Sequence, residues 1–200
     1  LGNLPHAEEL LDDTIRRAHG AGITDVRSNA LHERSNVAQL RGQYEMAIKL
    51  AYEALECVQS ATDRDRILSD IALTFSELGV YSAARDAYLV LSATAREEYV
   101  RWAAELNLLE IAALTGAELV FETHRARLAR QDLPPFLATA LELHLGLGYQ
   151  TFGNVSEAER HLLKAVALAG EHGINKSLFE AEEALQKLGA EVRLVGPEAL

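Results

Sequence analysis

Apolar residues recur along most of this chain at spacings of three and four, which places them on one face of an α-helix. Near the C-terminus the stripe is Ile174, Leu178, Ala181, Leu185 and Leu188. Ala and Leu, the strongest helix formers, together supply 65 of the 200 residues, whereas strand-favouring residues are sparse. The pattern therefore predicts an all-α fold of helices packed on helices.

The same pattern divides the chain into helical pairs. We predict pairs over 26–40 with 44–59, 63–78 with 81–94, 97–115 with 117–131, and 135–152 with 156–171. Residues 5–19 and 175–188 predict one further helix at each end, the first after a turn at Gly2 and the second ending at Gly189. Asp25, Asp132 and Ser156 are predicted to cap helices. Residues 190–200, with Pro197, are expected to form a tail.

Four glycines mark a repeat of 37 residues, at Gly42, Gly79, Gly116 and Gly153. Each lies between two helical patterns, where glycine supplies a positive φ for a tight turn. Five positions later, small residues at Ala47, Ala84 and Ala158 suit a close helix crossing, but Phe121 breaks this pattern. One helical pair cannot bury its apolar stripe alone, so the repeat predicts stacked pairs.

Charge and composition narrow the classes of partner. The net charge of −11 would repel nucleic acid and anionic membranes, so neither is expected to bind this segment. No apolar run approaches the length of a membrane span. The single Cys57 cannot form an internal disulfide, which fits a reducing compartment and predicts a cytoplasmic location. We expect no cofactor.

With this spacing the chain resembles the tetratricopeptide repeat family over about residues 26–189. The fourth unit carries the resemblance best, through Leu145, Gly146, Tyr149, Gly153, Ala158 and Ala165. The third departs from it at Glu118, Phe121 and Arg125, and the period exceeds the usual 34 residues of the family. The resemblance implies one array over 1–189, wound as a right-handed superhelix. Its parts would be a half repeat 1–25, repeats 26–61, 62–95, 96–132 and 133–172, and a capping helix 173–189.

In such arrays the first helix of each pair lines a concave groove that binds peptides. By resemblance, the groove would hold Asn29, His32, Asn36, Gln39, Arg66, Ser69, Leu73, Asn107 and His144, with Leu106 and Leu143 among its apolar positions. One subtype of the family clamps C-terminal carboxylates. Here His32 stands where that clamp needs a lysine, and Asp70 would repel a carboxylate, so we expect a basic or neutral peptide instead.

Candidate catalytic chemistry is sparse. The seven histidines form no metal-binding pair at helical spacing, and we interpret them as surface residues without a metal. Gly146 and Gly148 lie inside a helical pattern, so they indicate close packing rather than a phosphate loop. Cys57 has no activating His or Lys beside it and is expected to be a small buried residue.

The sequence thus favours a protein- or peptide-binding scaffold or sensing module in signalling, with no catalytic activity. The alternative is a helical-repeat enzyme or a regulator domain that binds a small molecule. The array opens with a second helix that lacks its partner, so we expect the chain to belong to a larger protein. The sequence leaves the oligomeric state open.

Overall fold

The computed structural model describes the backbone of residues 3–195 and the side chains of residues 3–189. This part of the chain forms ten α-helices and no strand, which confirms the predicted all-α fold. Gly2 and Pro197, for which we predicted a turn and a tail, lie outside the described residues. Among the described helices, none is long and apolar enough to cross a membrane.

The chain divides into two compact units within the sixth helix. Unit 1 extends to Ala104 and contains α1 (Leu4–Ala21), α2 (Thr24–Leu40), α3 (Tyr44–Cys57), α4 (Ala61–Glu77), α5 (Tyr81–Thr94) and the start of α6 (Glu98–Leu114). Unit 2 begins at Glu105 and contains the rest of α6, α7 (Glu118–Leu128), α8 (Pro135–Thr151), α9 (Val155–His172) and α10 (Asn175–Val195).

The helices repeat with the period of the glycines. The first helices of the pairs begin at residues 24, 61, 98 and 135, and the second helices at 44, 81, 118 and 155, so each step is 37 residues. Gly42, Gly79, Gly116 and Gly153 adopt φ values of 70°, 72°, 69° and 76° in the turns between them. The predicted glycine turns are therefore confirmed.

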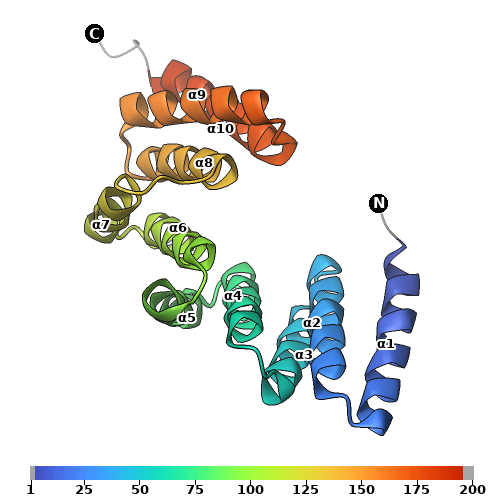
Figure 1. Cartoon of the computed structure of the whole chain (residues 1–200). Coiled ribbons are helices and arrows are strands. Elements are labelled where there is room, and N and C mark those ends of the chain that lie inside the picture. The colour runs from blue at the N-terminus through green and yellow to red at the C-terminus, as the bar shows by residue number, and fades with distance from the viewer. Residues whose placement is uncertain (1–2, 196–200) are drawn as a thin grey trace. The chain divides into compact units, whose positions relative to one another are not determined.

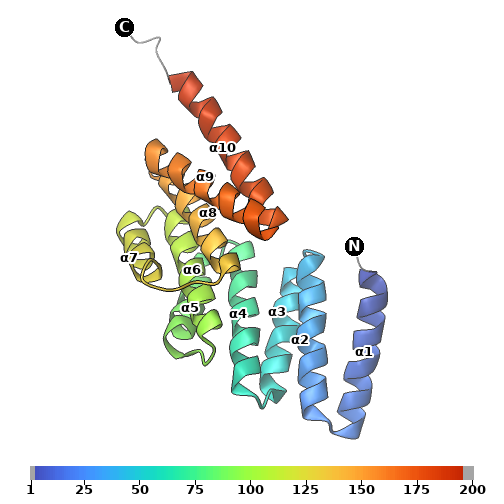
Figure 2. The same cartoon turned by 45° about the horizontal axis from the view of Figure 1, so that its top comes forward.

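Each unit has its own apolar core. In unit 1, α2 packs on α1 and α3, and α4 packs on α3 and α5, as both views show (Figure 1 and Figure 2). Its core is formed by Leu31, Ala51, Ala54, Val58, Ile67 and Ile71. In unit 2, α9 packs on α8 and α10 around Leu143, Ala158, Leu162, Ala165, Ala181, Ala184 and Leu188.

Close helix crossings explain both the small residues and their exception. Ala47, Ala84 and Ala158 are fully buried, as the repeat predicted. Phe121, at the equivalent position, is fully buried too, because Gly148 faces it and leaves room for the ring. The large residue is thus offset by a missing side chain on the facing helix.

Several local predictions were wrong. Helix α2 begins at Thr24, so Asp25 lies inside its first turn, and no side chain caps it. Helix α8 follows Pro134 without a side-chain cap from Asp132. Helix α9 begins one residue before Ser156, and the side chain of Asn154 caps it.

Two further predictions differ from the structure. Helix α10 continues through Gly189 to Val195, because a glycine without a positive φ need not end a helix. Cys57 is half-buried at the end of α3 rather than enclosed, and its thiol donates to the carbonyl oxygen of Glu53 at 3.3 Å.

Candidate functional site

Unit 1 carries a hollow where three predicted groove residues meet. Asn36 and Gln39 on α2 and Leu73 on α4 line a space of about 400 Å³, which we call the first hollow. Its other lining residues are Leu40, Tyr44, Asp70 and Glu77. Among residues 3–189, no other side chain hydrogen-bonds to the amides of Asn36 and Gln39. Both amides can therefore donate to and accept from a bound backbone.

A second hollow of about 340 Å³ gathers three more predicted residues. His32, Arg66 and Ser69 line it from α2 and α4, together with Asp70, Glu97, Tyr99, Val100 and Ala103. The guanidinium of Arg66 donates to both carboxylate oxygens of Glu97, at 2.9 and 3.1 Å. This second hollow therefore contains a cation that already has an anionic partner.

The residue pair His32 and Asp70 joins the two hollows. Asp70 lines both of them, and its Oδ2 lies 2.6 Å from Nε2 of His32. A carboxylate only accepts hydrogen bonds, so Nε2 of His32 carries the proton in this contact. The structure thus brings His32 and Asp70 into contact. These are the two residues that, in the sequence, argued against a site for C-terminal carboxylates.

The other predicted groove residues are distributed differently. Asn29 is exposed and lines a separate hollow of about 230 Å³ beside Asp25 and Asp63. In unit 2, Asn107 is half-buried, and Nδ1 of His144 lies 3.9 Å from Oε1 of Glu110. Leu106 and Leu143 are buried, so their predicted place on a groove surface was wrong.

Unit 2 holds a polar triad that occurs twice, each time with a buried Glu–His pair and an exposed cation. Oε1 of Glu105 on α6 lies 2.9 Å from Nδ1 of His124 and 3.2 Å from the guanidinium of Arg127, both on α7. Thirty-seven residues later, Glu142 on α8 lies 2.6 Å from Nδ1 of His161 and 2.7 Å from Nζ of Lys164, both on α9. Each triad therefore ties the two helices of one pair together.

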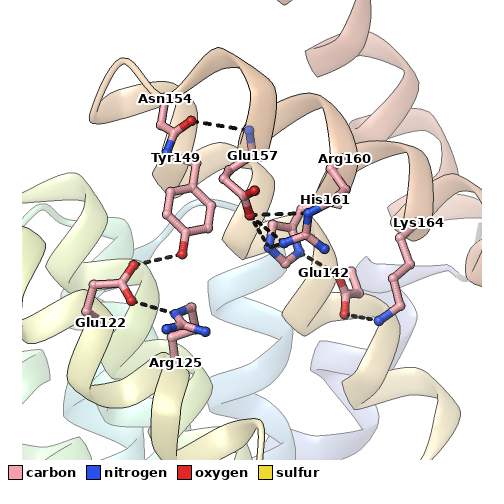
Figure 3. A network of polar contacts seen from close by, with 9 residues as sticks. All are labelled: Glu122, Arg125, Glu142, Tyr149, Asn154, Glu157, Arg160, His161 and Lys164. Carbon is pink, nitrogen blue, oxygen red and sulfur yellow. Dashed lines mark hydrogen bonds and ion pairs between the residues drawn. The ribbon is translucent and has the colours of Figure 1, made fainter.

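The second triad extends into a wider network (Figure 3). Nε2 of His161 lies 2.7 Å from the guanidinium of Arg160, which also donates to Glu157. Because Nδ1 donates to Glu142, His161 is the neutral tautomer that accepts at Nε2. The ring of Tyr149 stacks on that of His161, and its hydroxyl donates to Glu122 at 2.7 Å.

Burial and hydrogen bonding shift the pKa values of this network in opposite directions. Burial, together with the hydrogen bond to Glu122, raises the pKa of Tyr149 to about 12. Burial also acts to raise the pKa of Glu142, but hydrogen bonds from His161 and Lys164 outweigh it and hold the pKa below its ordinary value. His124 and Arg127 lower the pKa of Glu105 in the same way. Both buried carboxylates are thus kept ionised.

These triads correct the interpretation of all histidines as surface residues, because His124 and His161 are buried. Sequence analysis missed the triads, although Glu105, His124 and Arg127 recur as Glu142, His161 and Lys164 at the 37-residue period. In the part of the chain that the structure describes, no three His, Cys, Asp or Glu side chains are grouped to hold a metal ion.

Comparisons with known proteins show what this fold is similar to. No family model and no curated protein matches the chain. Among solved structures, BtubC (BKLC) from P. vanneervenii aligns with a TM-score of 0.61 and 15% identity, over 100% of this chain and 96% of that one. A tetratricopeptide repeat protein from Parabacteroides merdae aligns with a TM-score of 0.57 and 14% identity, over 95% and 79%. The chain therefore has a helical-repeat fold like that of a tetratricopeptide repeat protein.

Proposed function

We propose that this chain is a protein- or peptide-binding scaffold or sensing module, and that it binds on the face of α2 and α4 in unit 1. The observation that carries the proposal is the pair of adjoining hollows that share Asp70. They combine amides that can hold an extended backbone with an exposed leucine, Leu73, that can receive an apolar side chain. The similarity to a tetratricopeptide repeat protein supports this choice through the fold.

A catalytic role has less support. The titratable groups with the most extensive contacts, His161 and Glu142, are buried and bind one another. Both ring nitrogens of His161 are engaged, which leaves no position for a substrate proton. We therefore propose that these groups stabilise the repeats and that the chain has no catalytic activity.

A small-molecule ligand is the alternative, because the hollows fall in the lower part of the range of about 300–1,000 Å³ that ligand sites occupy. Such sites, however, enclose most of their ligand. Here the lining residues Leu73 and Arg66 are exposed, so the hollows are open on one side. An extended peptide, which can lie along α2 and α4, fits this shape better.

The test begins with capture of a partner from a lysate and continues with titration of purified proteins. Asn36→Ala should weaken binding by about 0.5–1.5 kcal/mol, the net contribution of one ordinary hydrogen bond. Glu53→Ala, on α3, is the control and should bind like the wild type. Equal affinity for all three proteins would remove Asn36 from the site. A stronger loss in Glu53→Ala would place the interface on α3 and contradict the proposal.

A further inference from the structure

We propose that the first hollow is a subsite for a cationic side chain, so that the bound peptide carries a Lys or Arg at this point. The inference rests on the proposed function and specifies the class of peptide. Three observations support it: the carboxylates of Asp70 and Glu77 line the first hollow, His32 orients Asp70, and the second hollow contains a cation that is already paired.

The first hollow presents two carboxylates without a matching cation. Asp70 and Glu77 line it from α4, and none of its described lining residues is Lys or Arg. Glu77 is exposed, and among the described residues no ion pair or hydrogen bond involves its side chain. A cation placed between these two carboxylates would gain attraction from both, whereas a carboxylate would be repelled.

Asp70 is held in position for such a contact. Its Oδ2 accepts the hydrogen bond from Nε2 of His32 at 2.6 Å, and no described residue donates to Oδ1. Both side chains are partly shielded, at 33% exposed for Asp70 and 16% for His32. A carboxylate that is already oriented loses little conformational entropy when a ligand donates to it.

The rest of the first hollow suits the long stem of a basic residue. Leu73 and Leu40 supply apolar surface, and Tyr44 adds an aromatic ring. Lys and Arg pack their methylene groups on such surfaces while the charged end reaches polar partners. A ring face also attracts a cation. The amides of Asn36 and Gln39 remain available for the peptide backbone beside it.

The second hollow has less of this preference. Its cation Arg66 is already paired with Glu97, and Val100 and Ala103 add apolar surface. Asp70, which it shares with the first hollow, is its only carboxylate without a cationic partner, whereas the first hollow adds Glu77. We therefore expect the preference for a basic side chain to come from Asp70 and Glu77 at the first hollow, and not from the overall negative charge of the chain.

The experiment uses the whole chain and a library of capped octapeptides in which one central position is fixed as Lys, Arg, Gln or Glu and the others are randomised. Peptides retained by the immobilised protein are quantified by mass spectrometry. We expect Lys and Arg peptides to be enriched about tenfold over Gln peptides, which corresponds to about 1.4 kcal/mol. Asp70→Asn and Glu77→Gln, singly and together, should reduce this enrichment to below threefold. Glu56→Gln, an exposed residue on α3, changes the charge equally and should keep it.

Each other outcome identifies which proposal fails. Enrichment that persists in the double variant would reflect bulk charge and would overturn the inference. Peptides that are retained without charge preference, but lost in Asn36→Ala, would overturn the inference and leave the proposed function in place. Retention that no substitution on α2 or α4 affects, or no retention at all, would contradict both. Circular dichroism melting of each variant separates loss of binding from loss of fold.

Discussion

A Cβ atom on Gly148 would lie 2.3 Å from Cε2 and 2.5 Å from Cζ of Phe121, so the ring occupies the space that this glycine leaves open. The ring cannot easily move away. It is fully buried and lies edge-on to Tyr149 and Phe152, with ring centroids 5.4 and 5.2 Å apart. Phe121 and Gly148 therefore act as a matched pair across α7 and α8.

We predict that Gly148→Ala destabilises unit 2. Alanine gains roughly 1 kcal/mol over glycine inside a helix. Overpacking against an enclosed ring costs about 1–3 kcal/mol and should exceed that gain. Urea unfolding followed by circular dichroism, combined with hydrogen exchange of α8 amides, measures the net change.

Two companion substitutions test the cause. Phe121→Leu shortens the side chain and should recover part of the stability of Gly148→Ala in the double variant. Gly170→Ala on α9 meets no atom within 4 Å and should be neutral or stabilising. If Gly148→Ala and Gly170→Ala change the free energy of unfolding equally, the ring of Phe121 does not prevent a larger residue at position 148.

The start of α9 provides a second prediction. The side chain of Asn154 accepts a hydrogen bond from the backbone NH of Glu157 at 3.3 Å. Asn154→Ala should therefore cost about 1 kcal/mol, the usual cost of losing an N-cap. Ser156→Ala is the control, because Ser156 is exposed inside the first turn and should change stability by less than about 0.5 kcal/mol. An equal loss of stability in Asn154→Ala and Ser156→Ala would show that the hydroxyl of Ser156 also caps α9.

Sequence reasoning predicted the helical pairs well because the turns and the close helix crossings each restrict which residue types can occupy them. A positive φ at Gly42 or Gly153 needs glycine, and a fully buried crossing at Ala47 or Ala158 suits a small residue. Helix starts were less accurate, because several residues near a turn can serve as a cap. Ser156 has the right chemistry, but Asn154 lies at the position where the helix begins.

The site was harder to predict, because tertiary pairing decides which polar residues remain available. Six of the predicted groove residues do line the two hollows of unit 1: His32, Asn36, Gln39, Arg66, Ser69 and Leu73. For Asp70, the sequence predicted only that it would repel a carboxylate ligand, and not that it lines both hollows. The partners of His124 and His161 come from the preceding helix, 19 residues earlier, and periodicity within one helix cannot reveal them.

The high pKa of Tyr149 gives a third prediction. A native pKa of about 12, against the ordinary value of 10, means that the folded state favours the protonated phenol. Its contribution to stability is complete below pH 10 and is lost as the pH rises from 10 to 12. With allowance for partial exposure, the loss should be about 1–2 kcal/mol.

Tyr149→Phe isolates this effect. The variant should be less stable than the wild type at pH 9, because the hydrogen bond to Glu122 is absent, and the difference should shrink toward pH 12. An absorbance titration of the phenolates, wild type minus variant, reports the pKa directly. A midpoint near pH 10 would contradict the proposed role of burial and of Glu122.

The repeated triads give the last prediction. Because His161 and Lys164 hold the pKa of Glu142 below its ordinary value of 4.5, the native state favours the carboxylate. The resulting stability is present above pH 4.5 and is lost as the pH falls below it. Glu142→Gln should therefore reduce the free energy of unfolding at pH 7 by about 1–3 kcal/mol, since it leaves the buried ring NH of His161 and the ammonium of Lys164 without their charged acceptor.

The difference between wild type and Glu142→Gln should diminish as the pH is lowered from 5 to 3, as measured by hydrogen exchange of α9 amides. Other carboxylates titrate in both proteins and cancel in the comparison. Glu105→Gln, the same change one repeat earlier, should act in the same direction, but less strongly, because its contacts are longer at 2.9 and 3.2 Å. Glu159→Gln, exposed on α9, removes one charge without a buried partner and should leave the profile unchanged. A pH-independent difference for Glu142→Gln would mean that the side chain acts through packing alone, and that its hydrogen bond with His161 and its ion pair with Lys164 add nothing to the stability of the repeat.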